Sequence, residues 1–176
     1  MATHRLVLAG FGGQGVMLIG QMIAYAGMLE GKEVTWMPAY GPEMRGGTAN
    51  CTVIVSDKKI SAPIVTEATA VVVMNSPSLI KFEQLVKPGG KLFINTSLIK
   101  EKSSRNDVEI YNVDANEIAV ELHNDKVSNM VILGAIINKT GMVKIESVEK
   151  VMDKLFTGNK AKLLPLNKAA LTAWQE

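Results

Sequence analysis

A glycine-rich turn near the amino terminus is the first feature of this sequence that could do chemistry. Residues 10–15 read Gly-Phe-Gly-Gly-Gln-Gly and match the pattern G-x-G-x-x-G between an apolar run and a longer apolar segment. Such a turn lets the backbone approach a phosphate closely, while the first N–H groups of the following helix point at the anion. The pattern predicts a cofactor- or phosphate-binding turn made by Gly10, Gly12, Gly13, Gln14 and Gly15. The alternative, that these glycines only let the helix pack on the sheet, stays open.

A second candidate site is the segment Tyr40-Gly41-Pro42-Glu43-Met44-Arg45-Gly46-Gly47. It lies within a stretch, 38–50, that is rich in glycine and proline and is expected to be a loop beyond the end of the second strand. Ligands and partners bind at that edge of open α/β sheets. Arg45 could present a two-pronged anion-binding group to a partner. Pairing between Arg45 and Glu43 on the surface is the alternative.

Alternating strands and helices are expected to position these segments. The apolar runs predict strands over 5–9, 34–37, 51–55, 70–74, 91–95 and 108–113. Helices are predicted over 16–29, 77–86, 115–122, 130–139 and 145–156, with a last one running to about residue 174. Ser76 and Asp114 are the expected N-caps of the second and third helices, and the Pro-Gly-Gly sequence 88–90 is expected to close the second.

The order of these elements predicts the fold class. The first strand, helix and second strand are expected to form a βαβ unit with parallel strands. The whole pattern is typical of an α/β, Rossmann-like, doubly wound and mainly parallel sheet. The length of 176 residues suits a single domain spanning 1–176.

The predicted helix over 16–29 is almost wholly apolar, because Gln21 is its only clearly polar side chain. A surface helix normally has a polar face opposite its apolar stripe. We therefore expect one side of this helix to pack on the sheet and the other side to be covered by another subunit. The chain is then expected to be bound to partner subunits, or to form a homodimer when isolated.

Composition excludes several function classes. One cysteine and two histidines cannot build a disulfide framework, an iron–sulfur cluster or a histidine-rich metal centre. A formal charge of +2 and 5% aromatic residues give no nucleic-acid surface. No apolar run reaches the roughly 18 residues of a membrane span, and no targeting segment is visible, so a cytoplasmic location is expected. Cys51 has no nearby histidine base and no serine elbow exists, so no catalytic residue is assigned.

Taken together, the two candidate segments resemble the gamma subunit of 2-oxoacid:ferredoxin oxidoreductases. The similarity continues through Asn75-Ser76-Pro77-Ser78, Val86-Lys87-Pro88-Gly89-Gly90, Asn129-Met130-Val131 and Gly134-Ala135, and so covers essentially the whole chain. Within the family, the form Tyr-Gly-Pro-Glu-Met-Arg-Gly-Gly-Thr-Ala-Asn at 40–50 is most similar to the 2-oxoglutarate branch.

The resemblance implies a subunit of an enzyme complex that is inactive by itself. Such complexes convert a 2-oxoacid, coenzyme A and oxidised ferredoxin into acyl-CoA, carbon dioxide and reduced ferredoxin. The resemblance places thiamine diphosphate, Mg and the 4Fe-4S clusters on alpha, beta and delta subunits. This chain would hold no cofactor alone; its glycine turn would contact coenzyme A or be purely structural, and its 40–47 segment would form a subunit interface at the rim of the active site.

Two other functions remain open from the residues alone. One is a free-standing oxidoreductase that binds NAD(P) or a flavin at the glycine turn. A nicotinamide site needs an acidic residue at the end of the second strand, and Glu33 stands at that strand's beginning instead. The other is a non-catalytic scaffold subunit.

Overall fold

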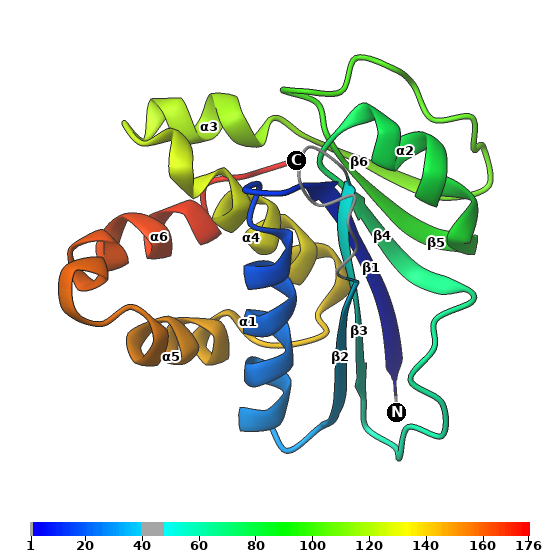
Figure 1. Ribbon diagram of the computed structural model, residues 1–176, viewed down its shortest axis with the longest axis horizontal. Helices are drawn as coiled ribbons and strands as arrows, with labels where there is room; N and C mark the ends of the chain where they lie inside the picture. The colour runs from blue at the N-terminus through cyan, green and yellow to red at the C-terminus, as the bar shows by residue number, and fades with distance from the viewer. Residues whose placement is uncertain (1, 40–47) are drawn as a thin grey trace.

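The computed structural model describes residues 2–39 and 48–176, which build one six-stranded sheet flanked by helices (Figure 1). The strands are β1 (Thr3–Phe11), β2 (Glu33–Ala39), β3 (Thr48–Ser56), β4 (Ala68–Val73), β5 (Val86–Asn95) and β6 (Glu109–Val113). The α-helices are α1 (Val16–Leu29), α2 (Ser76–Phe82), α3 (Ala115–Glu121), α4 (Ser128–Thr140), α5 (Ile145–Leu155) and α6 (Leu164–Leu171). Three short 3₁₀ turns are η2 (Glu83–Leu85), η3 (Asp125–Val127) and η4 (Gly158–Leu163).

The strand order is β2-β3-β1-β4-β5-β6. The β1–β4, β4–β5 and β5–β6 pairs are parallel, whereas β3 is antiparallel to both β1 and β2. The predicted α/β class with a mainly parallel sheet is therefore confirmed.

The predicted βαβ unit is wrong in one respect, because β2 does not pair with β1. β3 lies between them, with Thr3 opposite Ser56 at one end and Phe11 opposite Thr48 at the other. The physical reason is visible in β2, which contains Pro38 and is at best half-buried along its length. Proline has no N–H to donate to a neighbouring strand and is therefore confined within sheets to edge strands, strand starts and bulges. The more apolar β3, which buries Cys51, Val53 and Val55, takes the inner position.

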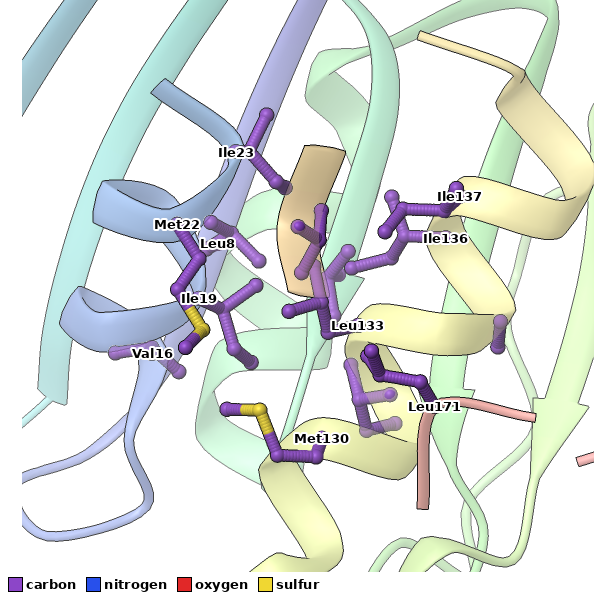
Figure 2. Close-up of a cluster of buried hydrophobic side chains, with 14 of the residues drawn as sticks. Leu8, Val16, Ile19, Met22, Ile23, Met130, Leu133, Ile136, Ile137 and Leu171 are labelled. Carbon is purple, nitrogen blue, oxygen red and sulfur yellow. The ribbon is translucent and has the colours of Figure 1, made fainter. Parts of the chain in front are cut away.

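Side chains of β1 alternate between two cores, as the period of a strand requires. Leu6 and Leu8 join a large core on the face covered by α1 and α4. Val7 and Ala9 join a smaller core on the opposite face, beneath α2. Figure 2 shows the larger core, where Leu8, Ile19 and Met22 approach Leu133 and Ile136 of α4.

The expectation that another subunit covers the outer side of α1 is wrong for most of that helix. α5 of the same chain packs against α1, and α6 packs against α4, so these helices form a further layer on that side of the sheet (Figure 1). Sequence could not show this, because α5 lies more than a hundred residues away. Only Tyr25, Met28 and Leu29 near the end of α1 remain substantially exposed.

Some local expectations also need correction. Asn75 caps α2, since its Oδ1 accepts a hydrogen bond from the Ser78 N–H at 2.9 Å; Ser76 instead is the first residue of that helix. Asp114 is the N-cap residue of α3, but its side chain makes no capping hydrogen bond. The α-helical part of α2 ends at Phe82, and residues 88–90 belong to β5 because the strand begins at Val86.

No helix within residues 2–39 and 48–176 has both the length and the apolar character needed to cross a membrane.

Cys51 lies fully buried in β3, with its Sγ 3.6 Å from the Val16 carbonyl oxygen. Burial raises the pKa of the Cys51 thiol to about 12. A thiol with that pKa is a poor nucleophile at neutral pH.

Candidate functional site

The glycine turn opens on a cavity of about 450 Å³ at the carboxyl edge of the parallel strands. Residues from four separate segments meet there, following β1, β4, β6 and α3. The cavity is lined by Gly13, Gln14, Gly15, Met74, Asn116, Asp125, Lys126, Ser128 and Asn129. In Figure 1 this edge is uppermost, where β1 passes into α1 and where α4 begins below α3.

Gly15 is fixed at this edge by two separate constraints. It is the N-cap residue of α1 and adopts a left-handed conformation with φ of 78°, which costs other residues about 1–2 kcal/mol. A Cβ at this position would also stand 2.4 Å from Nδ2 of Asn129. The turn and the start of α4 therefore approach as closely as they do only because residue 15 has no side chain.

The Gln14 side chain braces the turn from inside. Its Oε1 accepts a 2.6 Å hydrogen bond from the Phe11 N–H, and its Nε2 donates to the Met74 carbonyl oxygen at 3.1 Å. Asn75 Nδ2 also donates to Gln14 Oε1, at 3.3 Å. Gly10 leaves room for this arrangement, because a Cβ there would lie 2.7 Å from Gln14 Oε1. Gln14 thus joins the ends of β1 and β4, so a ligand at the turn would meet mainly backbone groups.

The electrostatic character of the cavity comes from two helix starts. Neither α1 nor α4 has a capping side-chain hydrogen bond or an acidic residue in its first turn. The first N–H groups of a helix lack partners within it and carry a partial positive charge. Lys126 adds a full positive charge at the wall and Asp125 a negative one. Within the described ranges Lys126 forms no ion pair, so its ammonium is available to an anion.

Asn129 gives the cavity a buried polar group. The residue is 9% exposed and lines the cavity, and its side chain makes no hydrogen bond to another residue in the described ranges. Buried amides normally have hydrogen-bond partners. The Asn129 amide does not belong to the buried side-chain atoms that lack a partner in the described part of the chain, so it reaches the cavity and adds a neutral donor and acceptor to the wall.

The groups that line the cavity are of the kinds that bind anions. One wall offers N–H donors, an ammonium and a carboxamide, which together suit a phosphate or pyrophosphate. Among the described residues no cluster of three metal-ligating side chains is found.

The sequence-predicted turn residues divide into two groups. Gly13, Gln14 and Gly15 line the cavity, whereas Gly10 and Gly12 do not, and Gly10 leaves room for the Gln14 side chain. The other predicted segment, Tyr40 to Gly47, lies outside the described residues. Its described neighbour Thr48 pairs with Phe11, which places the start of β3 at the same edge as the glycine turn.

Sequence reasoning missed the half of the site that comes from later segments, namely Asn116, Lys126, Ser128 and Asn129. One signal was present. Asn129 lies at the start of an apolar helix, and a polar side chain that is buried in such a helix indicates a hydrogen-bonding or functional role. Nothing in the sequence indicated that Asn116 and Lys126 would reach the same cavity, because their approach depends on how α3 and α4 pack.

Comparison with known families gives a match over residues 5–173 to the model described as pyruvate ferredoxin/flavodoxin oxidoreductase. A ketoisovalerate oxidoreductase subunit VorA from Methanothermobacter marburgensis is 36% identical over 96% of this chain and 35% of its own length. The 2-oxoglutarate synthase subunit KorC of Methanocaldococcus jannaschii is 34% identical over 89% of this chain and 86% of its own. A pyruvate/ketoisovalerate oxidoreductases common subunit gamma from Thermococcus litoralis is 36% identical over 87% and 86%. This chain thus spans about a third of the VorA relative and most of the other two.

Solved structures show the same fold. The gamma subunit of a keto/oxoacid ferredoxin oxidoreductase from Geobacter sulfurreducens superposes with a TM-score of 0.83 at 27% identity, covering 97% of this chain and 95% of that one. A 2-oxoglutarate:ferredoxin oxidoreductase from Magnetococcus marinus, with 2-oxoglutarate, coenzyme A and succinyl-CoA bound, gives a TM-score of 0.87. The identity to the latter is 23%, over 97% of this chain and 30% of that one, so this second likeness is one of fold.

Proposed function

Because this chain belongs to the pyruvate ferredoxin/flavodoxin oxidoreductase family, we propose that it is the gamma subunit of a 2-oxoacid:ferredoxin oxidoreductase complex. The complex would convert a 2-oxoacid, coenzyme A and oxidised ferredoxin into acyl-CoA, carbon dioxide and reduced ferredoxin. Alpha, beta and delta subunits would hold thiamine diphosphate, Mg and the iron–sulfur clusters. A single cysteine supports this division, because the chain cannot ligate such a cluster by itself.

The observation that carries the proposal is the cavity at the glycine turn. It combines two helix starts without side-chain caps, the Lys126 ammonium and the Asn129 amide. These groups suit a phosphate of coenzyme A, the reactant of the proposed reaction that carries phosphate groups. The chain would therefore position coenzyme A, and the chemical steps would belong to its partners.

The alternative of a nicotinamide-binding oxidoreductase has less support. In a dinucleotide site, the strand that supplies the ribose-binding acid lies beside the strand that precedes the glycine turn. Here β3 separates β2 from β1, and Glu33 stands opposite Ser56 at the far end of the sheet. An acidic residue at that end is too distant to reach a ribose held at the turn.

For the reacting 2-oxoacid, the first compound to test is 2-oxoglutarate, because the segment from Tyr40 to Asn50 is most similar to that branch. The names of the relatives range over ketoisovalerate, 2-oxoglutarate and pyruvate. Reduction of ferredoxin by the purified complex with each of the three compounds in turn would identify the substrate.

The role of the cavity can be tested with Lys126→Ala in the assembled complex, using 2-oxoacid-dependent ferredoxin reduction as the assay. Removing a charged hydrogen-bond donor from a phosphate costs about 1.5–3 kcal/mol, so we expect the KM for coenzyme A to rise about tenfold or more. The effect should fall on KM rather than on kcat, because the lysine binds and does not react. Lys150→Ala, on the exposed side of α5, is the charge-matched control. Equal KM values for the two variants would contradict the proposal.

The 40–47 segment is proposed to contact the thiamine-bearing subunits through Glu43 and Arg45. We expect Arg45→Ala to lower the yield of co-purified partner subunits, or to lower turnover about tenfold in complexes that still assemble, since an interfacial arginine can be worth more than 2 kcal/mol. Arg45→Lys, which keeps the charge but loses the two-pronged geometry, should recover only part of the loss. Unchanged assembly together with unchanged turnover would remove the proposed role.

A further inference from the structure

A separate cavity of about 400 Å³, here called the Arg5 cavity, lies near the amino terminus, at the end of the sheet opposite the glycine turn. One wall is formed where β1 and β3 pair, with Thr3 opposite Ser56 and Arg5 opposite Ile54. The other wall is the connection 57–67 between β3 and β4, at the lower end of the sheet in Figure 1. This connection contributes Lys59, Ile60, Ser61, Ala62, Ile64, Thr66 and Glu67 to the lining.

The backbone of Arg5 is fixed on both sides. On one side it pairs with Ile54 of β3. On the other, Thr69 Oγ1 accepts a 2.8 Å hydrogen bond from the Arg5 N–H and donates to the Arg5 carbonyl oxygen at 3.0 Å. The Arg5 guanidinium makes no ion pair among the described residues, although the Glu67 carboxylate lines the same cavity. The Arg5 side chain therefore starts from a fixed position and offers its N–H fork to a ligand.

The charges of the Arg5 cavity favour a monoanion. Lys59 adds a second positive charge to the lining, and it too forms no ion pair in the parts of the chain that the structure describes. Against Arg5 and Lys59 the lining holds one carboxylate, that of Glu67. A monoanion would balance the remaining positive charge, whereas Glu67 would repel a phosphate dianion more strongly.

Isoleucine side chains give the Arg5 cavity an apolar part. Ile54 is fully buried in its sheet wall, and Ile60 is half-buried in the connection. Ile64 is 69% exposed, so most of its side chain is open to solvent at the cavity. A ligand with a short alkyl chain would remove this apolar surface from water, which is favourable.

From these groups we infer that the Arg5 cavity binds a short-chain aliphatic monocarboxylate. The Arg5 guanidinium donates paired hydrogen bonds to the carboxylate, a geometry in which the two groups match. Lys59 adds attraction, and the alkyl chain lies against Ile60 and Ile64. The inference does not rest on the proposed function, because the residues of this cavity and those of the cavity at the glycine turn are different.

The first experiment titrates the full chain with isovalerate and follows its isoleucine methyl groups by NMR. We expect the signals of Ile54, Ile60 and Ile64 to shift together, while that of Ile80, which is exposed on α2, stays in place. Isovaleramide has nearly the same shape without the charge. It should bind at least about tenfold more weakly, because hydrogen bonds to a charged group are replaced by weaker ones.

Variants of the lining assign the roles of its charges. Arg5→Ala should raise the Kd for isovalerate about tenfold or more, and Arg5→Lys should recover only part of the loss. Lys59→Ala should raise the Kd about threefold, and its matched control is Lys58→Ala, since Lys58 is the neighbouring exposed lysine but does not line the cavity. Glu67→Gln should lower the Kd, because it removes the carboxylate that competes for Arg5.

Two sets of results would overturn the inference. One is an absence of methyl shifts, equal affinity for isovalerate and isovaleramide, or a Kd that Arg5→Ala leaves unchanged. The other comes from the assembled complex in which only this chain is labelled. Isovalerate should produce the same shifts there. Binding to the isolated chain that disappears in the complex would mean that a group of a partner subunit, and not a small molecule, fills the Arg5 cavity.

Discussion

Gly134→Ala is expected to destabilise this protein more than any other single-methyl change in its helices. A Cβ on Gly134 would stand 2.0 Å from the Leu171 carbonyl oxygen and 2.7 Å from its carbonyl carbon. Both are backbone atoms of α6, so no side-chain rotation can relieve the contact and α6 must move away from α4. Overpacking of a core costs about 1–3 kcal/mol and occasionally more. We expect about 3 kcal/mol in the free energy of unfolding, which for a chain of this size lowers Tm by roughly 6–12 °C.

The matched control is Gly27→Ala, a glycine-to-alanine change in the last turn of α1. Its Cβ would meet the Val34 Cγ2 atom at 2.9 Å, and a valine methyl on a half-buried edge strand can yield. Alanine also improves helix propensity by nearly 1 kcal/mol. Gly27→Ala should thus stay within about 1 kcal/mol of the parent in a thermal or urea unfolding experiment. Equal losses in the two variants would show that the close approach of α4 and α6 is not what requires Gly134.

Gly15→Ala is expected to have the second largest effect, and to damage binding as well as stability. The substitution forces a left-handed residue to carry a side chain and drives that side chain into Asn129. We expect a loss of about 3 kcal/mol, of which about 1–2 kcal/mol is backbone strain and the rest steric. Because Asn129 must leave its place at the cavity, the KM for coenzyme A in the assembled complex should rise at least about tenfold.

Gly13→Ala separates the two contributions to this effect. Gly13 has φ of 92°, but a Cβ there would meet nothing within 4 Å. It should lose only the strain energy, about 1–2 kcal/mol. In the double variant Gly15→Ala, Asn129→Ala, most of the steric part should be relieved, because the Nδ2 and Cγ atoms are removed and only the Cβ contact at 3.1 Å stays. A double-mutant cycle of urea unfolding should then give a coupling energy of about 1 kcal/mol. Additive losses would mean that Asn129 is not the group that confines residue 15.

Local pattern was enough to predict the strands, most of the helices and the glycine turn. The turn was recognisable because its left-handed backbone conformation favours glycine at positions 13 and 15. A preference of this kind depends on a few neighbouring residues and can be read from the sequence. The same holds for α5, whose apolar residues recur at helical spacing from Ile145 to Leu155. Cap positions were harder to assign, because Asn75 and Ser76 are both good caps and only the geometry selects Asn75.

Long-range packing decided what the sequence left open. β3 lies between β1 and β2 because β2 is the strand that tolerates the edge of the sheet. The outer side of α1 is covered by α5, which lies far away in the sequence. Half of the candidate site has the same origin. Asn129 and Lys126 belong to it because α4 packs on the sheet and starts beside the turn.

The sequence by itself determined an α/β chain with a glycine-rich turn after its first strand and too few cysteines to hold an iron–sulfur cluster alone, since these features depend on composition and on neighbouring residues. Only the tertiary structure decided the order of the strands and the groups that complete the cavity. Contacts between residues more than a hundred positions apart, such as Gly15 with Asn129, follow from the packing of whole elements. Local preference carries no information about which elements will meet.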